Sequence, residues 1–122
     1  MIVLDTNIII DHIQDDPEVS RWVKHQIENG ENFVISSLTV IELFSYPKST
    51  PEELSAIEHL LQELSLIEVN LTVARESARV RKECGITLVD ATIAATALLW
   101  NCPLATRDRA FKKIPDLVLL PV

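Results

Sequence analysis

The sequence predicts a three-layer α/β domain in which helices cover both faces of a central parallel sheet of about five strands. Two observations indicate this fold. Short apolar runs, such as residues 1–4, stop abruptly at polar residues, which is typical of strands buried on both faces. Longer segments with helical periodicity separate these runs, and crossover connections of about a dozen residues or more join parallel strands in a right-handed sense.

The first strand-helix unit begins at the amino terminus, where residues 1–4 form the first strand and stop at Asp5. Residues 8–13 then change to helical spacing and predict a short helix. Asp16 is followed by proline and an acidic residue, a pattern that predicts the start of a second helix, which ends near Gly30. Asp5 therefore stands at the carboxyl end of a buried strand, the edge at which ligand sites of α/β sheets collect.

A second unit repeats this order. Residues 33–35 predict the second strand, and Ser37 is the expected N-cap of a helix over residues 38–44. The stretch 50–53 has the capping-box pattern, and apolar residues follow it at helical period as far as residue 64. We therefore expect two helices between the second strand and the third.

The rest of the chain predicts two further helices and three strands. Residues 66–69 are expected to form the third strand, after which Asn70 caps a helix that stops at Gly85. An alanine-rich helix opens at Thr87 and contains Asp90. The last two strands are predicted over residues 104–106 and 117–120.

Length and composition fit one domain, residues 1–122. A chain of 122 residues with 48% hydrophobic residues can bury roughly two thirds of the surface that it exposes when unfolded. The first strand follows Met1 directly, and no apolar stretch is long enough to span a bilayer. We therefore expect a cytoplasmic protein without a membrane partner. The two cysteines and three histidines show no ligand spacing, so no zinc site is expected.

Charge is distributed unevenly along the chain. The net charge is −7, which argues against a protein that coats nucleic acid through general electrostatics. Residues 1–61 carry eleven acidic and three basic side chains, whereas residues 62–122 carry seven acidic and eight basic ones. An anionic substrate is therefore expected to contact the second half.

Four carboxylates fall at positions that this fold brings toward one cleft: Asp5, Glu42, Asp90 and Asp108. Each close pair would repel by about 4 kcal/mol at an effective dielectric constant near 20. Such a cluster needs protons or a divalent cation to persist. A site made only of oxygen ligands favours Mg²⁺ or Mn²⁺ over zinc, and these ions support phosphoryl chemistry.

Each of these acids also has a structural interpretation. Asp5 is a suitable N-cap for the helix that follows, Asp90 favours a helix N-terminus, and Asp108 can start a turn. Glu42 lies among apolar residues, which favours a buried acid with a partner. The remaining acids of interest are assigned to surface or capping positions: Asp11, Asp15, Asp16 and Asp116.

Four motifs in order resemble the PIN-domain ribonucleases, most closely the VapC-type toxins of toxin–antitoxin pairs. The motifs are IVLDTN at residues 2–7, SLTVIEL at 37–43, GITLVDATIAATA at 85–97 and LATRDRAF at 104–111. The resemblance covers the whole chain. It implies an endoribonuclease whose four acids, the same four as above, bind Mg²⁺ or Mn²⁺ and which cleaves RNA.

The resemblance also implies roles for neighbouring residues and for partners. Thr106 would orient a carboxylate or a water molecule, and Asn7 would hydrogen-bond within the same network. A homodimer and a cognate antitoxin that places a basic side chain near the acids are expected. Ala110 stands where some relatives carry a further acid, which leaves the number of ions open.

Basic residues flank Asp108 and are candidates for contacts with RNA phosphates. They are Arg107, Arg109, Lys112 and Lys113. A solvated basic turn is the alternative interpretation of these four residues.

Three other classes of protein compete with a nuclease. A response-regulator receiver needs an acidic pair after its first strand, whereas Asp5 stands alone. A haloacid-dehalogenase-type phosphatase needs a second acid at the position of Asn7. A catalytically silent PIN-like module that binds RNA or protein usually lacks one of the four acids, and here all four are present.

Overall fold

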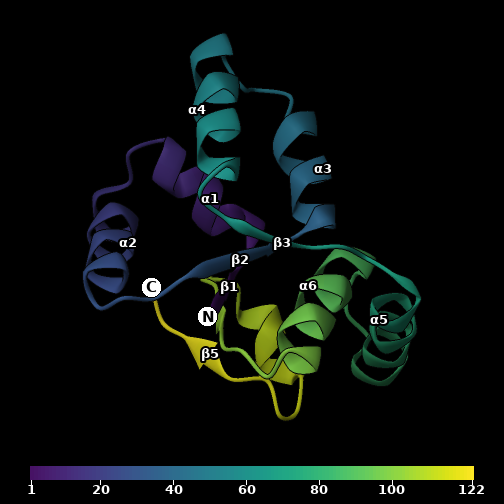
Figure 1. Cartoon of the computed structure of the whole chain (residues 1–122). Coiled ribbons are helices and arrows are strands. Elements are labelled where there is room, and N and C mark those ends of the chain that lie inside the picture. Colours follow the sequence, from purple (N-terminus) through teal and green to yellow (C-terminus); the bar gives the residue numbers. More distant parts are fainter.

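The computed structural model describes residues 1–122 and confirms the three-layer α/β architecture with a five-stranded parallel sheet (Figure 1). The strands are β1 (Ile2–Leu4), β2 (Phe33–Ser36), β3 (Ser65–Ile67), β4 (Leu104–Ala105) and β5 (Leu119–Leu120). The helices are α1 (Thr6–Ile13), α2 (Pro17–Glu28), α3 (Ser37–Ser45), α4 (Pro51–Leu61), α5 (Leu71–Cys84), α6 (Leu88–Leu99) and the short 3₁₀ helix η1 (Arg109–Lys113).

Successive side chains along the inner strands point alternately into two hydrophobic cores, one on each face of the sheet. Val3 and Val34 face the core formed with α5 and α6. Ile2, Leu4 and Ile35 face the opposite core, to which α1, α2, α3 and α4 contribute. The inner strands β1 and β2 are therefore apolar on both sides, because helices cover both faces of the sheet there.

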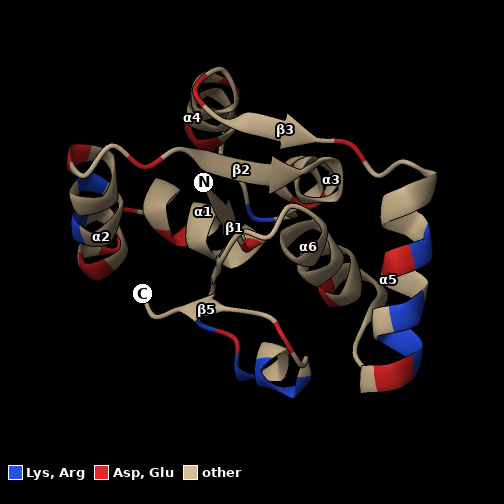
Figure 2. Ribbon diagram, turned by 60° about the horizontal axis from the view of Figure 1, so that its bottom comes forward, with Lys and Arg blue, Asp and Glu red and all other residues tan.

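The strand order is β3-β2-β1-β4-β5. The chain moves from β1 outward to β2 and β3, then crosses back to β4 and β5 on the other side of β1. The direction of winding thus reverses between β1 and β4, which pair with each other. Figure 2 shows β1 between β2 on one side and β5 on the other. Clefts form at the carboxyl ends of strands where the order reverses, so the residues after β1 and β4 are placed to share one.

Most of the predicted helix termini are confirmed. The side chains of Asp16, Thr50, Asn70 and Thr87 each accept a hydrogen bond from a backbone amide of the helix that follows. Gly85 ends α5 in the left-handed conformation, with φ of 65°, which glycine adopts without steric cost.

The predicted cap of α3 is wrong by one residue. Ser36, whose backbone is extended, accepts the capping hydrogen bond from the Leu38 amide. The Ser37 hydroxyl instead accepts a hydrogen bond from the Val69 amide, at 3.1 Å. Two adjacent serines can both cap, and the extended backbone that a cap requires belongs to the last residue of β2.

Three predicted strands differ in length from the observed ones. The third is Ser65–Ile67, the fourth ends before Thr106, and the fifth is only Leu119–Leu120. The third and fifth lie at the two edges of the sheet, where only one neighbour supplies hydrogen bonds. The helix η1 was not predicted, because five residues are too few to show helical periodicity.

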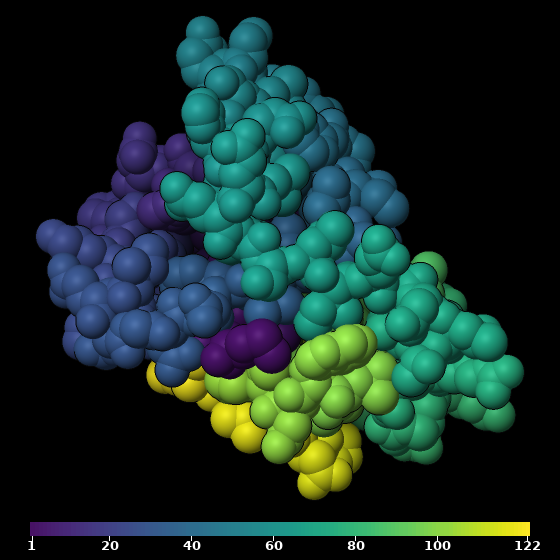
Figure 3. Space-filling view, in the orientation of Figure 1, coloured from purple at the N-terminus to yellow at the C-terminus, as the bar shows by residue number.

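The outline of the molecule is uneven. In the space-filling view α4 forms one projecting corner and α5 another (Figure 3). One face of α5 is buried through Val73, Ser77 and Val80. No helix of the chain has the length and apolar character needed to cross a membrane.

Candidate active site

Asp5 lies at the junction of β1 and α1 and faces the neighbouring strand. Its side chain is only 4% exposed. The Asp5 amide donates to the Ala105 carbonyl at 3.0 Å, and the Thr106 hydroxyl donates to Asp5 Oδ2 at 2.7 Å. Asp5 occupies the N-cap position of α1 but makes no capping hydrogen bond with its side chain. A purely capping role therefore does not explain this buried acid.

The surroundings of Asp5 disfavour its charged form. The pKa of Asp5 is raised from 3.8 to about 6, and burial is the main cause. The hydrogen bond from Thr106 opposes this rise, and the charge of Asp90 adds to it. A smaller lowering by the Thr6 amide is followed by a further rise from the charge of Asp108. Near pH 7 Asp5 is ionised at a cost of about 3 kcal/mol relative to an ordinary aspartate. A nearby positive charge would remove much of this cost.

Asp90 lies in the first turn of α6, after the capping residue Thr87. It is half-buried, and burial is the main cause that raises its pKa. The charge of Asp108 raises the pKa of Asp90 further, a hydrogen bond from Thr87 lowers it, and the charge of Glu42 adds a smaller rise. The fold therefore couples acids that come from α3, α6 and the loop after β4.

Glu42 lies half-buried on α3, and a side chain of α1 donates a hydrogen bond to its carboxylate. The Thr6 hydroxyl donates to Glu42 Oε1 at 2.5 Å and lies 3.2 Å from the Thr39 hydroxyl. Thr6 and Thr39 are both buried. Both lie inside the motifs at residues 2–7 and 37–43, but the sequence gives no sign that they meet, because they come from different helices.

Asp108 is exposed and caps η1 through a hydrogen bond from the Ala110 amide to Asp108 Oδ1, at 2.9 Å. Its own amide donates to the Thr106 hydroxyl oxygen at 3.0 Å. The Thr106 hydroxyl thus makes two contacts. It donates its proton to Asp5, and its oxygen accepts from the amide of Asp108. Asp108 therefore starts a turn, as its structural interpretation predicts. Its charge also raises the pKa of Asp5 and of Asp90.

The donor chemistry of this cluster fits a hard divalent cation, since all four side chains offer carboxylate oxygens. As the side chains stand, no three His, Cys, Asp or Glu residues are arranged to hold one ion. Three of the acids already accept hydrogen bonds: Asp5 from the Thr106 hydroxyl, Glu42 from the Thr6 hydroxyl and Asp108 from the Ala110 amide. Coordination by three acids therefore requires a change in side-chain torsion angles.

Two expected neighbours of the site lie outside the network. Asn7 is exposed and makes no side-chain hydrogen bond within the chain. Arg107 turns toward α1 and α2, where its guanidinium forms ion pairs of 3.0–3.3 Å. The acids that it contacts are Asp11, Asp16 and Glu18. Arg107 therefore connects the loop after β4 to the α1–α2 turn.

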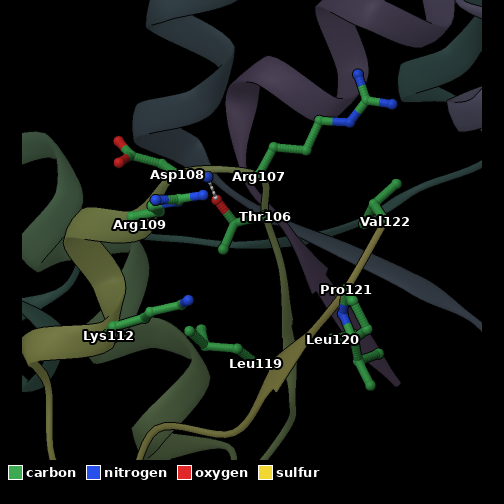
Figure 4. A pocket seen from close by; sticks show the side chains of 9 residues that line it. All are labelled: Thr106, Arg107, Asp108, Arg109, Lys112, Leu119, Leu120, Pro121 and Val122. Atoms are coloured by element: carbon green, nitrogen blue, oxygen red, sulfur yellow. Dashed lines mark hydrogen bonds between the residues drawn. The ribbon is translucent and has the colours of Figure 1, made fainter.

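Arg109 and Lys112 form no ion pair and line a pocket of about 420 Å³ at the carboxyl ends of β4 and β5 (Figure 4). The opposite wall is made by residues 119–122. Lys113 is exposed and does not line this pocket. Arg107 also lines the pocket, so three of the four predicted basic residues are found there, but the guanidinium of Arg107 is paired with acids of α1 and α2.

Removing the Thr106 hydroxyl with the Thr106→Val variant is expected to lower the free energy of unfolding by about 1–3 kcal/mol near pH 7, because the buried Asp5 carboxylate loses a donor. The pKa of Asp5 would rise further. Chemical denaturation measures the effect. Thr96→Val is the matched control, because the buried Thr96 hydroxyl only donates back to the Thr92 carbonyl in its own helix. Equal losses in the two variants would contradict a special role for Thr106.

Comparison with known proteins identifies chains that are similar to this one over nearly its whole length. The sequence model described as the PIN domain matches residues 2–117. Ribonuclease VapC19 of Mycobacterium tuberculosis is 32% identical, with 96% of this chain and 97% of that protein covered. A toxin–antitoxin complex from Klebsiella pneumoniae contains a chain that is 29% identical, with both chains fully covered and a TM-score of 0.82. VapBC2 from Rickettsia felis, solved bound to a DNA fragment from its promoter, contains a chain that is 27% identical, with 99% and 98% of the two chains covered and a TM-score of 0.83.

Proposed function

The chain belongs to the PIN-domain family, and we propose that it is an endoribonuclease of the VapC type, the toxin of a toxin–antitoxin pair, whose activity depends on Mg²⁺ or Mn²⁺. The similarity to ribonuclease VapC19 along nearly the whole chain supports the activity. The similarity to chains of solved toxin–antitoxin complexes supports the partner. A homodimer is part of the same proposal.

One observation supports the location of the active site above all others. Asp5 is buried beside two further acids, and its pKa is raised to about 6. Raised pKa values of clustered acids in a cleft are typical of functional sites. A structural role alone would not explain why the chain keeps a buried carboxylate without a cationic partner at the carboxyl end of its central strand.

We assign the ion to Asp5, Asp90 and Asp108, with Glu42 as a further ligand or as a base that orients water. When bound, a divalent ion lowers the pKa of a water nucleophile and neutralises charge on the phosphate that is cleaved. Thr106 fixes the orientation of Asp5 through its hydroxyl, and Thr6 does the same for Glu42. Asn7 is exposed near the same edge and is free to contact the substrate.

The substrate strand needs positive charge near an acidic site. Arg109 and Lys112 supply it, since both side chains are without an ion pair and lie on η1, the helix that follows Asp108. The antitoxin is proposed to place a basic side chain among the acids, where it would neutralise them and exclude the RNA. Both proposals follow from the same surplus of carboxylates.

Cleavage of a mixed RNA by the purified chain is expected only when Mg²⁺ or Mn²⁺ is added. Because a proton on Asp5 competes with the ion, the ion concentration for half-maximal cleavage should rise about tenfold for each pH unit below about 6. Above that pH the requirement should level off. A silent binding module would retain RNA without cutting it, so the same assay separates the two functions. Undiminished cutting in excess chelator would refute the metal dependence.

A further inference from the structure

The pocket beside Thr106 differs from the acidic cluster in both charge and shape. We propose that it binds one nucleotide of single-stranded RNA adjacent to the cleaved bond, with the phosphate held by Arg109 and Lys112 and the base or ribose against residues 119–122. This inference rests on the proposed ribonuclease function. It adds a specificity site to that function, with the C-terminal strand as one wall.

The pocket shares a wall with the site of cleavage. Thr106 lines it, and the hydroxyl of Thr106 is bonded to the buried Asp5. The volume of about 420 Å³ lies within the range of about 300–1,000 Å³ that is usual for small-ligand sites. A strand of RNA whose phosphodiester lies at the acids therefore has room for a neighbouring nucleotide here.

Two unpaired cations lie at this pocket. Figure 4 shows the side chains of Arg109 and Lys112 along one side of it, while the Asp108 carboxylate points away from Thr106. The guanidinium of Arg107 extends away from both cations and is paired with acids of α1 and α2. Asp108 is the only acidic side chain that lines the pocket. With two unpaired cations against it, the pocket is locally positive in a chain whose net charge is −7, and this favours an anionic ligand.

The opposite wall is apolar. Leu119, Leu120, Pro121 and Val122 line it. A site for a phosphate alone gains nothing from such a wall, whereas a nucleotide has both an anionic and an apolar part. Bases that are recognised singly are those of unpaired strands, because a duplex keeps its bases stacked. A single-stranded segment fits this combination of surfaces.

A basic segment of the antitoxin is the competing occupant, and the charges argue against it. Arg109 and Lys112 would repel a basic side chain, while the acids beyond Thr106 would attract one. The two ligands are therefore expected to reach opposite sides of Thr106. A binding experiment can distinguish them directly.

The test measures binding of RNA to a variant that is not expected to cleave it. A full-length, ¹⁵N-labelled Asp5→Asn protein is titrated with a mixed-sequence single-stranded RNA heptamer, and amide signals are monitored by NMR. The largest shifts are expected at the amides of residues 109–112, 119, 120 and 122, because Pro121 has no amide proton. Lys112→Glu, made in the same background, should weaken the affinity about tenfold. Lys113→Glu makes the same charge change one residue outside the pocket and should weaken it by less than about twofold.

A second pair of variants tests the apolar wall. Leu119→Ala should weaken binding of the heptamer and change the preferred base next to the cut in the wild-type background. Val118→Ala removes a similar apolar side chain from an exposed position in the preceding loop, outside the pocket, and should do neither. Thermal melting of each variant verifies that it is folded.

Several results would overturn the inference. They are equal weakening by Lys112→Glu and Lys113→Glu, absence of shifts at the pocket amides, and stronger shifts there with a nona-arginine peptide than with RNA. If the wild-type chain cleaves RNA but the pocket amides do not respond, the pocket inference fails and the ribonuclease proposal stands. If the heptamer binds in the pocket but no RNA is cleaved with either ion, the pocket is a binding site for single-stranded RNA and the ribonuclease proposal fails.

Discussion

The Asp5→Asn variant is expected to lose RNA cleavage by about a thousandfold or more while becoming more stable than the wild type near pH 7. The activity falls because the buried ligand that is held by Thr106 loses its charge. The stability rises because an amide pays no cost for ionisation in a buried position, and the pKa of about 6 for Asp5 corresponds to a gain of about 1–3 kcal/mol. Cleavage rates and denaturant unfolding of the metal-free protein measure the two effects.

The pH dependence of this gain has a definite sign. The pKa of Asp5 is higher in the folded chain than in the unfolded chain, so the native state binds the proton more tightly. The stability of the wild type relative to Asp5→Asn should therefore fall as the pH rises from about 4 to about 6, and the difference should vanish below about pH 4. Asp116→Asn is the control, because Asp116 is exposed and should affect neither activity nor this slope. If Asp5→Asn were less stable than the wild type at pH 7, the idea that ionisation of the buried Asp5 destabilises the folded chain would be contradicted.

Binding of Mn²⁺ is expected to stabilise the wild-type chain by about 3 kcal/mol at an ion concentration one hundred times the dissociation constant. An ion that binds the native cluster and not the unfolded chain shifts the equilibrium by mass action. It also offsets the burial, and the smaller mutual repulsion, that raise the pKa of Asp5 and Asp90. Thermal melting over a series of Mn²⁺ concentrations measures the effect as a rise in Tm of several degrees.

The control for this titration is a variant with both Asp5→Asn and Asp90→Asn, whose Tm should be insensitive to Mn²⁺. The Asp116→Asn variant should respond as the wild type does. A flat titration of the wild type would argue against a metal site among the acids. An equal response of the double variant would place the ion elsewhere.

Short sequence patterns predict much of the fold. The buried strand that stops at Asp5 is recognisable because an apolar run ends at a charge, and the caps at Thr50, Asn70 and Thr87 are recognisable because each precedes a helical period. The error at the cap of α3 arose between adjacent serines that have the same capping chemistry. Only the extended backbone of Ser36 in the folded chain identifies it as the N-cap.

The rest of the site depends on contacts between distant segments. The hydrogen bond from Thr6 to Glu42 joins two helices, and Thr106 reaches Asp5 from the other end of the chain. Arg107 lies beside Asp108 in sequence, where a role in binding phosphate is natural, but the fold brings acids of α1 and α2 against it. Neighbours in sequence thus predict which side chains are available, and tertiary packing decides which of them are already paired.

The central claim is that Asp5, Asp90 and Asp108 hold one divalent ion between them. Anomalous scattering from Mn²⁺ in crystals of this protein tests it most directly. We expect a peak within coordination distance of carboxylate oxygens from Asp5 and at least one of the other two acids. A peak confined to other acids of the surface, or carboxylates that stay apart at saturating Mn²⁺, would contradict the claim.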